Sequence, residues 1–367
     1  MIYPKREEFI KLAAGANIVP VVREIHSDTQ TPIGIFMQFA GQQNSFLLES
    51  VEGGEKWARY SFIGRSPYMT FSANGDEITI VENGKTRKTA GNPLEALKAL
   101  FAQFIYAKLD GLPRFAGGAI GYFAYDAVRY IEDLPGAPPD DMNVPDCYLM
   151  FCDEVIAYDH LQQKVMVIVN AHVNSDAAGA YDMALKRLEE TGSALEAGAA
   201  APKKAAGGGA KTAAFASNFS KDQFCAAVEQ AKQYIYDGDV FQVVLSQRLA
   251  VETQADPFDV YRILRTLNPS PYLYYLNLPD AVIVGSCRSF WCAWRTTLSK
   301  PARSRVRGRA AKPPRRTTRW RTTCCRTKRS WPSIRCWSTS AATTSARSPS
   351  SAAWWSRTRC TSKSIRT

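Results

Sequence analysis

The last 81 residues of the chain contain no aspartate and no glutamate. Between Cys287 and Thr367 there are 17 Arg and 4 Lys, so this tail carries a charge of +21, and the other 286 residues carry −9. The tail holds 7 of the 8 Trp but only four Leu, Ile or Val residues. Folded domains need aliphatic residues at a regular period, and natural disordered segments are poor in aromatic residues. The tail therefore matches neither class of segment.

Other features are scarce in the rest of the chain. No apolar run approaches the ~18 residues that a membrane span needs, and residues 1–10 have no apolar segment typical of a signal peptide, so we expect a cytoplasmic protein without membrane contact. Outside the tail the three cysteines form no CxxC pair, which is typical of reduced thiols. Three histidines fit no metal-ligand spacing and are assigned no role: His26, His160 and His172.

The periodicity of apolar residues predicts a mixture of strands and helices. Short apolar runs between turn signals predict strands at 33–39, 46–48, 60–63, 68–71, 78–81, 148–158, 164–169, 240–251, 272–278 and 281–284. Helical spacing predicts helices at 93–105, 176–190, 220–239 and 258–267. The third of these begins at Ser220 with Gln223 three residues later, which has the form of a capping box.

Composition divides the chain into four parts. An N-terminal domain is expected over 1–192, an Ala/Gly/Lys linker over 193–217, the start of a second domain over 218–286, and the basic tail over 287–367. Interleaved Arg and Trp in the tail superficially resemble a nucleic-acid-binding surface.

Two short motifs offer candidate binding groups. Glu49 and Ser50 end a predicted strand, where they could bind an ammonium group, although a solvated strand end is the simpler interpretation. The run 268–272, Asn-Pro-Ser-Pro-Tyr, is a rigid turn whose simplest role is structural.

Taken together, these and further strings resemble component I of anthranilate synthase, a chorismate-binding enzyme of tryptophan biosynthesis. The matching strings lie in order over nearly all of residues 1–286: 47–50 (Leu-Leu-Glu-Ser), 57–64 (Trp-Ala-Arg-Tyr-Ser-Phe-Ile-Gly), 117–126 (Gly-Gly-Ala-Ile-Gly-Tyr-Phe-Ala-Tyr-Asp), 238–248 and 268–275. The resemblance stops after Ser286, where the family continues with Ser-Pro-Glu and this chain has Cys287-Arg288-Ser289.

A change of reading frame accounts for the tail. When its codons are regrouped one base earlier, they permit the family strings Ile-Ala-Gly-Thr and Ala-Glu-His in their expected order. Codons of a GC-rich gene that are read out of frame tend to encode Arg and Trp. The basic charge is then an accident of translation, and nucleic-acid binding is disfavoured.

The resemblance implies an α+β fold, a two-domain antiparallel β-sandwich with outer helices whose C-terminal part is missing or scrambled. It implies conversion of chorismate and ammonia to anthranilate and pyruvate, with Mg²⁺ as cofactor and a glutamine amidotransferase subunit as the ammonia source. The catalytic residues and metal ligands of the family fall in the replaced tail, so none is expected in this chain.

The resemblance also implies a feedback site for L-tryptophan at Glu49, Ser50, Pro271, Tyr272 and Leu273. The alternatives are aminodeoxychorismate synthase component I, which shares two of the motifs, and a catalytically dead tryptophan-binding module. A nucleic-acid-binding tail fused to an enzyme fragment is a third hypothesis.

Resequencing the gene across the codons for 284–289 tests the frame change directly. We expect a single-nucleotide difference that restores Ser-Pro-Glu and the family strings downstream. A confirmed sequence identical to the present one would leave the tail as the true product.

Overall fold

The computed structural model describes residues 1–39, 41–50, 59–137, 139–198 and 214–287. The predictions for 57–58, for most of the linker and for the tail from 288 therefore lie outside the described residues. Two compact units are present, Met1–Lys211 with Thr253–Ala293, and Thr212–Glu252 with Trp294–Thr367. None of the described helices is long and apolar enough to cross a membrane.

The first unit is mixed α+β, and its described strand pairs are antiparallel, in agreement with the expected α+β class. Its larger sheet has eight strands in the order β1-β2-β11-β10-β4-β3-β14-β15. Their bounds are β1 Ile2–Tyr3, β2 Ile18–His26, β11 Lys164–His172, β10 Glu154–Asp159, β4 Tyr60–Gly64, β3 Ser45–Glu49, β14 Tyr272–Asn277 and β15 Val282–Cys287.

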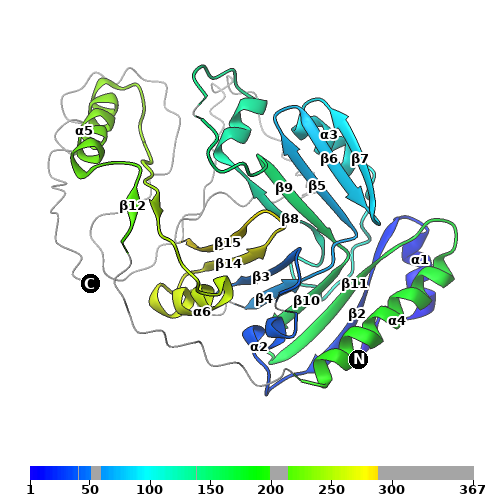
Figure 1. The fold of residues 1–367 in the computed structure, drawn as a ribbon. Coiled ribbons are helices and arrows are strands. Elements are labelled where there is room, and N and C mark those ends of the chain that lie inside the picture. The colour runs from blue at the N-terminus through cyan, green and yellow to red at the C-terminus, as the bar shows by residue number, and fades with distance from the viewer. Residues whose placement is uncertain (40, 51–58, 138, 199–213, 288–367) are drawn as a thin grey trace, which may run out of the picture. The chain divides into compact units, whose positions relative to one another are not determined.

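Helices cover one face of this sheet. They are α1 (Arg6–Ala13), α2 (Pro32–Met37), α4 (Ala177–Glu196) and α6 (Pro257–Leu267). The core between them and the sheet includes Phe9, Phe36, Leu188 and Tyr261, all at most 1% exposed. Figure 1 shows α4 lying along β2 and β11, to which it contributes a buried apolar side. Burial of this apolar area is the main force that holds the layer together.

A smaller sheet has five strands in the order β7-β6-β5-β9-β8. Their bounds are β7 Lys85–Ala90, β6 Glu77–Glu82, β5 Met69–Asn74, β9 Cys147–Cys152 and β8 Gly118–Phe123, and a 3-10 helix, η2, follows at Tyr125–Tyr130. Helix α3 (Pro93–Phe101) packs against it through Leu97 and Leu100. Alternate residues of β9, among them Met150, join Phe46 and Leu276 in a cluster between the two sheets.

The second unit contains α5 (Lys221–Asp237) and a two-stranded ladder of β12 (Ala216–Ser217) and β13 (Leu249–Ala250). The capping box is confirmed, because the Ser220 hydroxyl accepts a hydrogen bond from Gln223 N and the Gln223 side chain accepts one from Ser220 N. Gly238 ends the helix with a φ of 87°.

Several predictions of secondary structure were wrong. The single strand predicted over 148–158 is two strands, β9 and β10, which belong to different sheets. Residues 33–39 are not a strand, because Pro32 occupies the first turn of α2 and Thr31 Oγ1 accepts a hydrogen bond from Gly34 N. The strand predicted over 240–251 is reduced to β13, because Ala216–Ser217 is its only strand partner among the described residues. Helix α4 continues to Glu196, past its predicted end at 190 and into the predicted linker, because Leu195 is buried.

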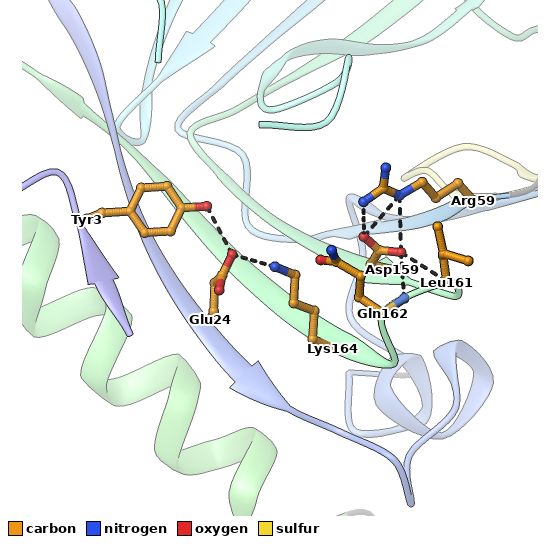
Figure 2. A network of polar contacts seen from close by, with 7 residues as sticks. All are labelled: Tyr3, Glu24, Arg59, Asp159, Leu161, Gln162 and Lys164. Carbon is orange, nitrogen blue, oxygen red and sulfur yellow. Dashed lines mark hydrogen bonds and ion pairs between the residues drawn. The ribbon is translucent and has the colours of Figure 1, made fainter. Parts of the chain in front are cut away.

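Buried polar contacts link neighbouring strands of the large sheet (Figure 2). Asp159, which is fully buried, accepts from Arg59 Nη2 at 2.8 Å and from the backbone N–H groups of Leu161 and Gln162. These contacts connect the start of β4 to the turn between β10 and β11. Desolvation opposes ionisation, but the Arg59 guanidinium and the two amides lower the pKa of Asp159. The carboxylate therefore stabilises this turn in its charged form.

The close approach of β8 to β9 predicts the effect of a single added methyl group. A Cβ at Gly121 would lie 1.8 Å from the backbone oxygen of Tyr148, which cannot rotate away. We expect Gly121→Ala to lower the free energy of unfolding by about 1–3 kcal/mol. A Cβ at Gly15 meets nothing within 4 Å, so Gly15→Ala should change it by less than about 0.5 kcal/mol. Urea unfolding compares the two variants, and equal midpoints would contradict the prediction.

Candidate functional site

A buried carboxylate stands at the end of β3. Glu49 is 3% exposed and pairs with Leu273 of β14 in the antiparallel register. Successive side chains of a strand point to opposite faces, and Leu47 belongs to the core beneath the helices. Glu49 therefore faces the helical layer rather than the smaller sheet.

Helix α6 supplies the partners of this carboxylate. Tyr261 OH donates a hydrogen bond of 2.6 Å to Glu49 Oε2, and Arg265 Nε lies 3.0 Å from the same oxygen. Residues four apart share one face of a helix, so a single helical face presents both groups. The helix is placed by Pro257 at its first position and by Asp256, whose side chain accepts from Phe258 N. Burial and the neighbouring Glu49 raise the pKa of Tyr261, so its hydroxyl remains a donor.

Two acceptors of the site have no hydrogen-bond partner among the described residues. They are Glu49 Oε1 and Ser50 Oγ, and both atoms are inaccessible to solvent. Buried polar atoms are almost always satisfied by protein, water or ligand. Because Tyr261 and Arg265 both engage Oε2, the second carboxylate oxygen remains available to a donor. A charged donor such as an ammonium group is the kind of partner that Oε1 lacks.

His160 and Ser61 flank this carboxylate on the neighbouring strands. Ser61 Oγ and His160 Nε2 are 2.8 Å apart, and the imidazole lies against the Tyr158 ring with 4.9 Å between centroids. Burial lowers the pKa of His160, although the negative charge of Glu49 opposes this effect. His160 is therefore neutral at neutral pH, and Arg265 is the cation nearest to Glu49 in the described site.

The turn before β14 is held by hydroxyl groups. Ser270 is fully buried; its Oγ accepts from Tyr272 N at 3.1 Å and donates to Cys287 O. Ser286 Oγ donates to Asn268 O at 2.8 Å. These contacts fix the entry of the chain into β14 and hence the position of Leu273 opposite Glu49.

The predicted ligand-binding residues occupy two adjacent strands. Glu49 and Leu273 are cross-strand partners, and Ser50 follows Glu49 directly. Pro271 and Tyr272 lie at the start of β14, where Tyr272 pairs with Cys287 of β15. Leu273 is 1% exposed and belongs to the core, so it forms an apolar wall rather than a surface group.

Sequence reasoning missed Tyr261, Arg265 and His160. The spacing of Tyr261 and Arg265 on a predicted amphipathic helix is the signal that could have identified the first two. His160 was assigned no role because it belongs to no metal-ligand spacing, and the structure brings it to the site from another part of the chain. Among the residues that the structure describes, no group of three or more His, Cys, Asp or Glu could hold a metal ion.

The chain is similar to known proteins over most of its described length. Residues 43–288 match the profile of the chorismate binding enzyme family. Anthranilate synthase component 1 of Acetivibrio thermocellus is 47% identical over 296 residues, which cover 78% of this chain and 59% of the relative. That of Pseudomonas aeruginosa is 40% identical over 291 residues, covering 77% and 58%. The chain thus spans about three-fifths of the length of these curated relatives.

A solved structure is similar to part of the chain. The crystal structure of anthranilate synthase component I from Streptococcus pneumoniae TIGR4 is 28% identical and has a TM-score of 0.49, covering 72% of this chain and 57% of that one.

The lowered pKa of His160 predicts a loss of stability in mild acid. The unfolded chain takes up this proton near pH 6.5, whereas the folded chain takes it up only at lower pH. The stability that buried, neutral His160 contributes is therefore fully present above about pH 6.5. It is lost as the pH falls through the lowered pKa, at no more than about 1.4 kcal/mol per pH unit.

Urea unfolding at pH 7.5 and pH 5.5 measures this loss. We expect His160→Gln to reduce it and the exposed His26→Gln to leave it unchanged. An undiminished loss in His160→Gln would refute the assignment.

Proposed function

Since the chain belongs to the chorismate-binding enzyme family and is a homologue of anthranilate synthase component I, we propose that its gene encodes the large subunit of an anthranilate synthase. The complete protein converts chorismate and ammonia to anthranilate and pyruvate in the cytoplasm. Ammonia comes from glutamine through a separate glutamine amidotransferase subunit. The names of the Acetivibrio thermocellus and Pseudomonas aeruginosa relatives favour this activity over aminodeoxychorismate synthesis.

In this proposal the in-frame part of the protein ends near residue 286, and the residues after it are translated from a shifted reading frame. The family match ends at residue 288, and the composition changes from Cys287 onward, which supports a frame change at this point. We therefore assign 287–367 to an out-of-frame tail. The domains expected over 1–192 and 218–286 stay predictions, because α4 continues to Glu196 and β14 and β15 belong to the large sheet of the first unit. Chorismate chemistry is not expected from this product.

Mg²⁺ is the cofactor implied by the family, and the described residues do not fit it. They offer no cluster of three potential ligands, and the one unpartnered carboxylate oxygen of the site belongs to a side chain already held by Arg265. No step of the reaction is assigned to these residues.

The function that this product can retain is regulatory binding of L-tryptophan. The observation that carries this proposal is the pair of unpartnered buried acceptors, Glu49 Oε1 and Ser50 Oγ, beside the apolar side chain of Leu273. The ammonium group of tryptophan would donate to both oxygens. Leu273 would contact its indole ring, and backbone groups of Pro271 and Tyr272 would close the site.

The contacts of α6 hold Glu49 in place for a ligand. Arg265 and Tyr261 hold Oε2, so ligand binding does not require Glu49 to reorient. A preorganised acceptor lowers the entropic cost of binding. Tyr261 and Arg265 are thus positioning residues that act on the ligand through Glu49.

Isothermal titration of the full chain with L-tryptophan tests the proposal. We expect Glu49→Gln to weaken binding by about 10- to 100-fold, because a hydrogen bond to a charged group contributes about 1.5–3 kcal/mol. The matched control is Glu77→Gln, the same substitution at an exposed carboxylate of β6 that pairs with Lys88. Equal affinities of Glu49→Gln and Glu77→Gln would contradict the assignment.

A fluorescence assay for anthranilate accompanies the titration. The chain as written should give no product from chorismate, ammonium and Mg²⁺, whereas a frame-restored gene product should give it. Activity in the chain as written would overturn the proposed division between retained and lost functions.

A further inference from the structure

A cavity of about 280 Å³ lies within the first unit, apart from the Glu49 site. It opens where the chain passes from the small sheet to the large one, between the end of β9 at Cys152 and the start of β10 at Glu154. Five phenylalanine and tyrosine rings line it: Tyr68, Phe101, Phe104, Tyr106 and Phe151. Phe101 and Tyr106 are more than 40% exposed, so the wall is in contact with solvent at these rings.

The cavity contains one unpartnered polar atom in a buried residue. Asn170 of β11 is 3% exposed, and its Nδ2 donates a hydrogen bond of 2.7 Å to Ala116 O. This bond fixes the orientation of the amide, because only the nitrogen can donate to a carbonyl. Oδ1 has no hydrogen-bond partner among the described residues and is inaccessible to solvent. Asn170 Oδ1 is therefore a fixed acceptor of a residue that lines the cavity.

The backbone around Asn170 is shaped to admit this side chain. Gly117 has a φ of 155°, and a Cβ at this position would lie 2.1 Å from Asn170 Nδ2. Asn170 N also donates to Asp153 O at 2.7 Å. The absence of a Cβ at Gly117 leaves room for the Asn170 side chain, and the backbone bond to Asp153 fixes the position of Asn170 in β11. The acceptor Oδ1 is therefore held in place by the fold.

The charged and titratable groups of the cavity are neutralised within the protein. The Asp153 carboxylate accepts from Arg187 Nη1 at 2.6 Å and from Nη2 at 3.1 Å. The His172 ring contacts the Tyr68 ring at 4.5 Å between centroids, and burial lowers the pKa of His172. A charged ligand would find no free counter-charge among these groups, whereas a neutral ligand would meet aromatic surface.

We propose that this cavity is a binding site for a small, neutral, planar aromatic molecule whose single N–H or O–H group donates to Asn170 Oδ1. An apolar cavity of about 150 Å³ takes one benzene ring, so about 280 Å³ suits two fused rings. Edge and face contacts with the five aromatic rings supply most of the affinity, and the hydrogen bond selects the donor-bearing ligand.

Titration of the full chain with indole and with benzothiophene tests the proposal. The two probes have nearly the same size and shape, but only indole has an N–H donor. We expect indole to bind about 3- to 10-fold more tightly, the effect of one hydrogen bond to a neutral acceptor. Equal affinities, or no binding of either probe, would overturn the proposal.

Two variants separate the acceptor from the aromatic wall. Asn170→Ala should remove the preference for indole while benzothiophene still binds, which also shows that the cavity is intact. Tyr106→Ala, at a partly exposed position, should weaken both probes alike. If Asn170→Ala does not fold, the preference in the parent chain and the effect of Tyr106→Ala decide the question.

Competition with L-tryptophan distinguishes this cavity from the Glu49 site. Saturating L-tryptophan should leave the binding of indole unchanged. Displacement of indole by L-tryptophan would place the probe at the Glu49 site instead and refute the proposal.

Discussion

The contact between Glu49 and helix α6 is the constraint on which the rest of the site depends. A carboxylate that is 3% exposed is costly to bury, and Tyr261 and Arg265 compensate by engaging one of its oxygens. Removal of one partner from such a buried pair typically costs about 3–5 kcal/mol. The same contact aligns β3 with β14, so the geometry of the site and the continuity of the large sheet have a common origin.

Much of the fold could be predicted from local patterns. The capping box at Ser220, the helix that opens at Pro93 and the hairpin around Pro279 all depend on residues close together in sequence, and the structure contains each of them. The errors over 240–251 and at the end of α4 arose where a tertiary partner decides the outcome, whereas α2 was missed although its signals at Thr31 and Pro32 are local. Residues 240–248 have strand-like composition, yet strands require neighbours, and only Leu249–Ala250 has one among the described residues.

The candidate site was predictable in part and for a different reason. Resemblance to a family pointed to Glu49 and Leu273, and the antiparallel register places them opposite each other. No pattern in the sequence could reveal that Oε2 is occupied while Oε1 has no partner, because this depends on the position of α6. The aromatic cavity is still less accessible to sequence reasoning, since its wall comes from segments between Ile18 and His172 that no single period connects.

The distance along the chain between the partners of the buried carboxylate has a consequence for biosynthesis. Tyr261 follows Glu49 by 212 residues, and β14, which comes still later in the chain, pairs directly with β3 on the side opposite to β4. At translation rates of about 5–20 residues per second, these partners emerge roughly 10–40 seconds after Glu49. During that interval β3 has an unpaired edge and Glu49 lacks its cation, so the nascent chain can associate wrongly with other chains through this edge.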